Sequence, residues 1–245
     1  MVSFVADADH LGTDEAAWMA HLDVLQLATL EVPDVARAIV IAPHPDDEVL
    51  AVGGLLRHLH RRGIELVVVA VTDGEGSHPA EPAAAVARTR REEATAAYLA
   101  LGIDPTCQTL GIADGAVADD EGVLATALGA LTGPGDLVVA PWQHDGHPDH
   151  DAVGRAASTV VARTGALLLA YPVWAWHWAV PGSDHLPLDR AVVLPLDAGD
   201  RTAKAAAVTA FTSQLTPRSG PVRDPVLAPS ALARFARPFE VLFTP

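Results

Sequence analysis

The sequence predicts a three-layer α/β fold in which a mostly parallel sheet lies between two layers of helices. Short apolar runs rich in β-branched residues alternate along the chain with longer stretches of helical periodicity. Several of these runs lack the polar–apolar alternation that is typical of a strand with one solvent-exposed face. Their composition indicates strands that are buried on both faces. Such strands are typical of parallel sheets whose connecting helices cover both faces.

The length and composition indicate one soluble domain. A chain of 245 residues is within the range of a single α/β domain and can bury a sizeable core. Half of the residues are hydrophobic, yet no apolar run approaches the ~20 residues of a membrane span. The first ten residues contain Asp7 and Asp9, where a signal peptide would have basic and apolar residues. We therefore expect a cytoplasmic protein.

The formal net charge of −15 bears on the class of partner. It repels phosphate backbones and anionic lipids, so we expect no nucleic-acid partner and no membrane partner. A neutral or cationic small molecule is the favoured substrate. The one cysteine, Cys107, excludes an internal disulfide and suits a reducing compartment, and we expect a buried, inert thiol.

We expect residues 1–245 to form a single domain with three parts: an N-terminal extension at 1–37, a core at 38–215 and a proline-rich C-terminal segment at 216–245. A helix is predicted in the extension, with Thr13 as its cap. The residues that support this helix are Asp14 and Glu15 in its first turn and Trp18, Leu22 and Leu25 on its apolar face. We expect it to pack on the outside of the domain.

The core opens with a β-α-β unit. Ala38 to Ala42 is almost wholly apolar and predicts a buried strand, after which Pro43 and Pro45 turn the chain. Residues 48–62 are predicted to form a helix that ends at Gly63. Residues 64–72 follow as a strongly β-branched strand.

The alternation continues through the rest of the core. Further helices are predicted at about 89–101, 122–131, 151–163 and 198–211, and further strands at 108–112, 137–140, 166–170 and 191–196. Beyond them, Pro217, Pro221, Pro225 and Pro229 disfavour regular helix and central strand. We expect the C-terminal segment to cover the surface as loops.

Two clusters of histidine and aspartate follow predicted strands. His44 and the acids at 46–48 come directly after the first core strand, and the segment from 142 to 150, Trp-Gln-His-Asp-Gly-His-Pro-Asp-His, follows the strand at 137–140. In open parallel sheets, ligands bind beyond the carboxyl ends of the strands. The two clusters therefore predict one site at that edge of the sheet.

The residue types in these clusters predict a metal site. His44 and Asp47 are close enough on a tight turn to bind one ion, and His150 would complete a set of two histidines and one carboxylate. Three protein ligands with an open position are typical of catalytic zinc, which lowers the pKa of bound water from ~15.7 toward ~7. The same set also accepts iron(II), cobalt or nickel.

The neighbouring residues suit proton transfer. Asp46 is next to a predicted ligand but cannot easily bind the same ion, so its carboxylate is a candidate general base. His147 could donate to the oxyanion or to the leaving amine. Asp149 could hold His147 in its charged form and in the correct orientation.

Both clusters resemble the signatures of a known family. The segments Ala-Pro-His-Pro-Asp-Asp-Glu at 42–48, followed by Gly53 and Gly54, and His-Pro-Asp-His-Asp-Ala-Val-Gly at 147–154 resemble the PIG-L/LmbE family of zinc-dependent N-deacetylases. The resemblance extends over residues 38–215 through the segments 72–75, 90–93 and 101–102, and through Lys204, Ser213 and Gln214.

This resemblance implies a Rossmann-like fold and removal of an N-acetyl group from an amino sugar, a glycoside or a related amide. It implies the same roles as the residue types do. His44, Asp47 and His150 would bind zinc, Asp46 would be the base, and His147 would donate to the oxyanion. It also makes Arg90 a candidate substrate contact in an Arg-x-x-Glu element with Glu93, although Arg91 is not excluded. Asp73, at a strand end, is a second candidate for contact with a substrate hydroxyl.

Other features leave alternatives open. The aromatic stretch from Tyr171 to Trp178 fits sugar binding, core packing or a subunit contact, so a homo-oligomer remains an option. Amide hydrolysis could act on a larger amide such as a thiol conjugate, and a non-catalytic protein could keep the metal for stability. The lack of Gly-x-Gly-x-x-Gly after the first core strand argues against nicotinamide binding.

Overall fold

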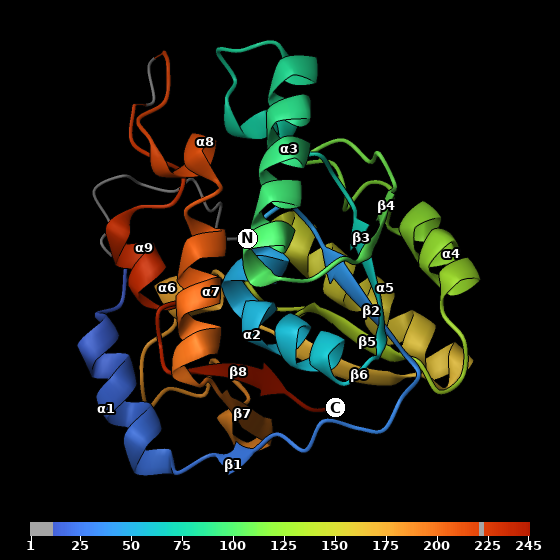
Figure 1. Cartoon of the computed structure of the whole chain (residues 1–245), viewed down its shortest axis with the longest axis vertical. Helices are drawn as coiled ribbons and strands as arrows, with labels where there is room; N and C mark the ends of the chain where they lie inside the picture. The colour runs from blue at the N-terminus through green and yellow to red at the C-terminus, as the bar shows by residue number, and fades with distance from the viewer. Residues whose placement is uncertain (1–11, 221–222) are drawn as a thin grey trace.

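A computed structural model describes residues 12–220 and 223–245, so that the positions of Asp7, Asp9 and Pro221 lie outside the described residues. In these residues one sheet of eight strands has the order β1-β7-β8-β6-β5-β2-β3-β4 (Figure 1). The strands are β1 Ala28–Thr29, β2 Arg37–Ala42, β3 Glu65–Ala70, β4 Thr106–Thr109, β5 Leu137–Pro141, β6 Leu167–Tyr171, β7 Ala191–Pro195 and β8 Phe239–Phe243. All pairings are parallel except those of β8, so the predicted α/β fold with a mostly parallel sheet is confirmed.

Helices cover both faces of this sheet. They are α1 Glu15–Leu25, α2 Asp47–Arg61, α3 Ala83–Leu101, α4 Glu121–Leu131, α5 Pro148–Thr164, α6 Ala175–Trp178, α7 Ala198–Val208, α8 Thr212–Leu215 and α9 Pro229–Ala233. Side chains of α2, α3 and α7 share one hydrophobic core, and those of α4 and α5 share a second. A third cluster joins α1 and α6 to the part of the sheet around β7 and β8.

The central strand β2 shows why its sequence is wholly apolar. Ala38 and Val40 face the core under α2 and α3, whereas Ile39 and Ile41 face the core under α4 and α5. All four residues are at most 1% exposed. A strand buried on both faces cannot alternate polar and apolar residues.

The position of β2 in the strand order also determines where the site lies. It pairs in parallel with β5 on one side and β3 on the other, so the carboxyl ends of β2 and β5 are adjacent. The chain leaves β2 toward β3 through α2, and β5 lies on the opposite side. This reversal of strand order is where open α/β sheets bind ligands.

The C-terminal segment differs from the sequence prediction. We expected loops after residue 216, yet β8 lies inside the sheet, between β7 and β6, and is antiparallel to both. The prolines at 217–229 come before this strand, and Phe239 to Phe243 has none, so it can donate its backbone N–H groups. Pro229 itself occupies the first helical position of α9, where proline is well tolerated.

The starts of α1 and α3 also differ from the prediction. Asp14, and not Thr13, caps α1, because Asp14 Oδ1 accepts hydrogen bonds from the backbone N–H groups of Ala16 and Ala17. The Thr13 hydroxyl instead donates to the carbonyl of Ala179. α3 begins at Ala83 directly after Pro82, because no helix breaker separates Pro82 from the stretch we predicted.

The expected burial of Cys107 is wrong. Cys107 is exposed because it lies on β4, the edge strand of the sheet. No helix within residues 12–220 and 223–245 combines the length and the apolar composition that a membrane span requires.

Candidate active site

The ends of β2 and β5 bring the two sequence clusters together. His44 lies in the turn after β2, and Asp47 is the first residue of α2. α5 begins at Pro148, three residues earlier than predicted, because proline suits the first helical turn. His147 is therefore the N-cap of α5, and His150 lies in its first turn.

Three ligand atoms converge on one point. His44 Nδ1 lies 3.3 Å from Asp47 Oδ2, His150 Nε2 lies 3.2 Å from the same oxygen, and the two nitrogens are 3.3 Å apart. Among the described residues these side chains form a candidate metal site. The predicted ligand set therefore meets in space, although its two histidines are 106 positions apart in the sequence.

Asp145 orients the imidazole of His150. Asp145 Oδ2 lies 2.8 Å from His150 Nδ1, and both residues are 0% exposed. The Asp145 carboxylate also accepts the backbone N–H groups of Val173, Trp174 and Ala175. A carboxylate with these donors can only accept from Nδ1, so in the neutral ring of His150 the unprotonated nitrogen is Nε2, which faces the convergence point.

The second nitrogen of His44 is held in the same way. His44 Nε2 lies 3.1 Å from Asp114 Oδ1 and 3.2 Å from Asp149 Oδ2. Asp149 also accepts the backbone N–H groups of Gly115 and Val117, which fix its carboxylate. In its neutral form, His44 therefore donates through Nε2 and has its unprotonated Nδ1 on the side of Asp47 and His150.

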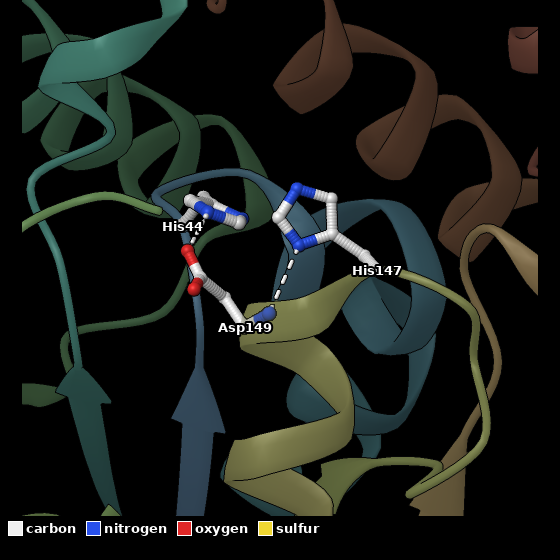
Figure 2. A group of neighbouring side chains, drawn as sticks. All are labelled: His44, His147 and Asp149. Atoms are coloured by element: carbon white, nitrogen blue, oxygen red, sulfur yellow. Dashed lines mark hydrogen bonds and ion pairs between the residues drawn. The ribbon is translucent and has the colours of Figure 1, made fainter. Parts of the chain in front are cut away.

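His147 lies next to both ligand histidines, with ring centroids 4.9 Å from each. Its Nδ1 accepts the backbone N–H of Asp149 at 3.2 Å, as Figure 2 shows. The neutral ring then carries its proton on Nε2, which leaves that N–H as a donor. Burial, together with nearby His150 and His44, lowers the pKa of His147 to about 3, so its neutral form is favoured.

Asp149 differs from the role we predicted for it. Its carboxylate binds His44, and only its backbone N–H contacts His147 (Figure 2). Asp149 thus orients a predicted metal ligand, and its carboxylate makes no hydrogen bond that would hold His147 in a charged form.

Asp46 is buried beside an arginine. Asp46 is 5% exposed, and its Oδ2 lies 3.2 Å from Arg90 Nη2. Burial raises the pKa of Asp46 to about 6, although the charge of Arg90 opposes this shift. Arg90 is only 2% exposed and also donates to the carbonyl of Pro45. Its polar contacts are therefore with Asp46, the candidate base, and with the turn that precedes Asp46.

The charges of the ligand residues are strongly coupled. Burial disfavours the charged form of His150, but Asp47 and Asp145 outweigh it and raise the pKa of His150 to about 9. Burial likewise opposes ionisation of Asp47, and the two histidines outweigh it and hold the pKa of Asp47 well below its usual value. Without a metal ion, the cluster is stabilised by sharing protons between histidines and carboxylates.

The other predicted positions lie around this centre. Asp73 follows β3 and pairs through Oδ2 with Arg91, and its Oδ1 has no hydrogen-bond partner among the described residues. Contacts of Arg90 and Asp73 with a substrate stay predictions. His144 of the second cluster is exposed.

Asp145 and Asp114 belong to the site but were not predicted from the sequence. Asp145 stands in the second cluster, two residues before His147, and its burial could not be inferred from that spacing. Asp114 lies in a loop 70 positions from His44, and only the fold brings the two together. A polar residue inside a cluster of ligands is a signal that could have identified Asp145.

The aromatic stretch serves mainly as core. Tyr171 is 0% exposed and donates its hydroxyl to the carbonyl of Ile41, and Trp176 packs edge-on against Trp18. Trp178 is partly buried and donates to the carbonyl of Asp145. The stretch therefore supports the turn that carries Asp145 and His147.

Comparison with known proteins agrees with this site. The PIG-L family model, described as GlcNAc-PI de-N-acetylase, matches residues 39–161, which are half of the chain and contain both clusters. The chain belongs to the PIG-L family. The family resemblance of the two motifs is thus confirmed.

Individual relatives of this PIG-L family member are distant. A Bacillus cereus protein named probable N-acetyl-alpha-D-glucosaminyl L-malate deacetylase 2 is 30% identical over 134 residues, or 51% of this chain and 60% of that protein. The 1D-myo-inositol 2-acetamido-2-deoxy-alpha-D-glucopyranoside deacetylase of Mycolicibacterium gilvum is 27% identical over 181 residues, or 62% of each chain. The chain therefore spans less than two thirds of the length of these curated relatives.

Among solved structures, the zinc-inhibited form of the teicoplanin deacetylase Orf2 is similar to this PIG-L family member. The TM-score is 0.59 at 20% identity, over 73% of this chain and 85% of that chain. At this level of identity the similarity shows that the two proteins share a fold.

Proposed function

We propose that the protein is a zinc-dependent N-deacetylase that hydrolyses the acetamide of an amino sugar or of an amino-sugar glycoside. The observation that carries this proposal is the convergence of His44, Asp47 and His150 in a site that also contains His147 and lies next to Asp46. The names of the two curated relatives, both deacetylases of amino-sugar conjugates, support the substrate class.

The donor set fits zinc. Atoms bound at ~2.0–2.1 Å in a tetrahedral arrangement lie ~3.3–3.4 Å from one another. The three observed separations are 3.3, 3.2 and 3.3 Å. Two neutral imidazoles and one carboxylate are also a ligand set that catalytic zinc sites use.

Zinc in this site would supply a Lewis acid that polarises the amide carbonyl and makes water a nucleophile at neutral pH. We assign the proton transfers to Asp46, whose pKa of about 6 is close to the pH at which a general base works best. The Asp46 carboxylate takes the proton of the attacking water and later passes it to the leaving amine. Arg90 keeps this carboxylate in place.

His147 would stabilise the developing negative charge. Its Nδ1 is occupied by the backbone N–H of Asp149, so its Nε2–H is free to donate a hydrogen bond to the oxyanion. A neutral imidazole is a sufficient donor for this purpose. The assignment of Arg90 and Asp73 as substrate contacts, and the cytoplasmic location, stay predictions.

The test is release of free amine from a panel of N-acetylated amino sugars. The purified protein is assayed as isolated, after chelation, and after zinc is restored. We expect release that the chelator abolishes and zinc restores. A protein that binds zinc but releases no amine would contradict the proposed substrate class and favour a larger amide, such as a thiol conjugate. A protein that binds no zinc would contradict the metal site.

A further inference from the structure

The helix that carries Asp47 is broken. Val52 has φ −134° and ψ 22°, which are not helical values, so α2 consists of a short segment at 47–51 and a longer one at 53–61. A break leaves the first N–H groups of the second segment without intrahelical acceptors. Gly53, Gly54 and Leu55 are buried, so these groups need acceptors from elsewhere in the protein.

Glu240 supplies these acceptors from the middle of the sheet. Its Oε1 accepts the N–H of Gly54 at 2.7 Å, and its Oε2 accepts the N–H of Leu55 at 2.8 Å. Lys204 of α7 donates through Nζ to Oε1 at 2.6 Å. Glu240 and Lys204 are 3% and 4% exposed.

Gly54 permits this arrangement. A Cβ atom at position 54 would lie 2.3 Å from Leu196 Cδ2 and 3.1 Å from Glu240 Oε1. Any larger residue would push the helix away from the carboxylate. Gly54 of the first sequence motif therefore has a structural reason, which is the close approach of Leu196 and Glu240 to the break.

Stability alone does not account for this ion pair. Removing two charges from water costs several kcal/mol, and buried ion pairs often stabilise a fold no better than apolar side chains of the same size. The Glu240 carboxylate does more than pair with Lys204, because it is aimed at the positive end of a helix segment. The pair determines where that segment begins.

The direction of the first segment matters for the metal site. Asp47 lies five residues before Val52, or ~7.5 Å along a helix axis, so a tilt of ~10° at the break would move it by ~1.3 Å. Functional groups must be held within ~0.5 Å of their working geometry. A small change at the break would therefore separate Asp47 from His44 and His150.

We propose that Glu240, with Lys204 as its partner, is a positioning residue for the metal site, because it binds the break in α2 and so fixes the direction of the segment that carries Asp47. Glu240 does this through its two hydrogen bonds to Gly54 and Leu55, and Lys204 neutralises its charge. The proposal rests on the proposed function, since it assumes that Asp47 binds the metal.

The test compares zinc affinity with folding stability in E240Q, K204M and the double variant. Zinc affinity is measured by competition with a chromophoric chelator, and stability by urea unfolding of the metal-free protein. In E240Q only one N–H keeps an acceptor, so we expect zinc affinity to fall by ~10- to 100-fold, as for other residues that support a ligand. The visible spectrum of the cobalt(II)-substituted variant should shift, because the ligand geometry changes.

The double variant separates positioning from stability. E240Q leaves the Lys204 ammonium buried and unpaired, whereas E240Q/K204M removes that charge and should regain stability. Its zinc affinity should stay as low as that of E240Q, because the second N–H still lacks an acceptor. K204M keeps both hydrogen bonds and should bind zinc more tightly than E240Q.

Asp200→Asn is a matched control. Asp200 lies on α7 like Lys204, but it pairs directly with α2 through Arg57 and Arg61, which lie beyond the break. This variant should lose stability and keep its zinc affinity. Zinc affinity that follows stability across all variants would overturn the positioning role. Wild-type protein that takes up no zinc would overturn the metal site together with the positioning role, whereas wild-type binding with unchanged E240Q affinity would overturn the positioning role alone.

Discussion

The protonation of single nitrogen atoms decides whether this cluster can bind a metal. His150 donates through Nδ1 to Asp145, and His44 donates through Nε2 to Asp114 and Asp149. In its neutral form, each ring therefore has its unprotonated nitrogen at the point where the Asp47 carboxylate also lies. The carboxylates that orient these rings therefore contribute to metal binding, because they fix which nitrogen faces the metal.

Asp46→Asn tests the general base. The amide cannot take a proton from water, so we expect turnover to fall at least ~100-fold while zinc stays bound. Turnover is measured by amine release, and zinc by elemental analysis. Asp120→Asn, at an exposed position, is the control and should change neither quantity. Near-normal turnover of the Asp46 variant would remove it from the mechanism.

Removal of a metal ligand should weaken zinc binding more than removal of the carboxylate that orients this ligand. His150→Ala should release the metal, whereas Asp145→Asn should weaken zinc binding by ~10- to 100-fold. The amide group introduced in the Asp145 variant would donate to Nδ1 of His150 and so place the ring proton on Nε2, where the metal binds. Elemental analysis and chelator competition measure the two effects. Full metal occupancy in His150→Ala would exclude it from the ligand set.

At the scale of elements, the site depends on how closely α5 packs against the end of β5. Gly154 of α5 lies against this strand end: a Cβ there would be 2.6 Å from Gln143 Cα and 2.7 Å from the carbonyl oxygen of Pro141. These are backbone atoms, so they cannot move aside as a side chain would. The glycine lets the first turn of α5 bring His150 to the site.

Gly154→Ala should therefore destabilise the protein, although alanine is the better helix former. The gain in helix propensity is ~1 kcal/mol, whereas overpacking costs ~1–3 kcal/mol. Zinc affinity should fall as well, because α5 carries His150. Urea unfolding and chelator competition measure both.

Gly129→Ala in α4 is the matched control, because a Cβ there would meet no atom within 4 Å. This variant should gain stability by ~0.5–1 kcal/mol and keep its zinc affinity. A gain in stability in the Gly154 variant would contradict the close packing of α5.

Over the whole molecule, the carboxyl ends and the amino ends of the parallel strands have different roles. The carboxyl ends of β2 and β5 hold the site, while their amino ends are joined by an ion pair between Arg37 Nη2 and Asp136 Oδ2 at 2.6 Å. Burial raises the pKa of Asp136, but the hydrogen bonds from Arg37 outweigh it, so the net pKa lies below its usual value. This pair should affect stability and leave catalysis unchanged.

The pKa shift gives the pair a definite pH dependence. A carboxyl whose folded pKa is below its unfolded value of ~3.9 contributes stability above that value, and the contribution is lost as the pH falls through the folded pKa. Asp136→Asn should therefore lower the free energy of unfolding at pH 7, and the difference from wild type should shrink as the pH falls below the unfolded value of ~3.9. Urea unfolding of the metal-free proteins over this pH range measures this. A difference that persists in acid would show that the charge of Asp136 is not its source.

Much of the fold was predictable because its signals are local. The strand from Ala38 to Ala42 is apolar throughout since both of its faces are buried, and the helices follow from periodicity and glycine stops. The strand β8, which lies inside the sheet, was not predicted, because the prolines before it indicated loops. The capping of α1 by Asp14 depends on hydrogen bonds that spacing alone does not reveal. The start of α5 at Pro148 follows a local preference of proline that the prediction did not use.

The sequence by itself determined the chemistry of the site, since the ligand types and their short spacings, such as His44 with Asp47 and His147 with His150, are encoded within single turns. Only the tertiary structure decided which carboxylates orient which rings. Asp114 and Asp149 reach His44 across 70 and 105 positions, and Glu240 reaches Gly54 across 186. Contacts at such separations depend on the order of strands in the sheet, because strand order determines which chain ends become neighbours.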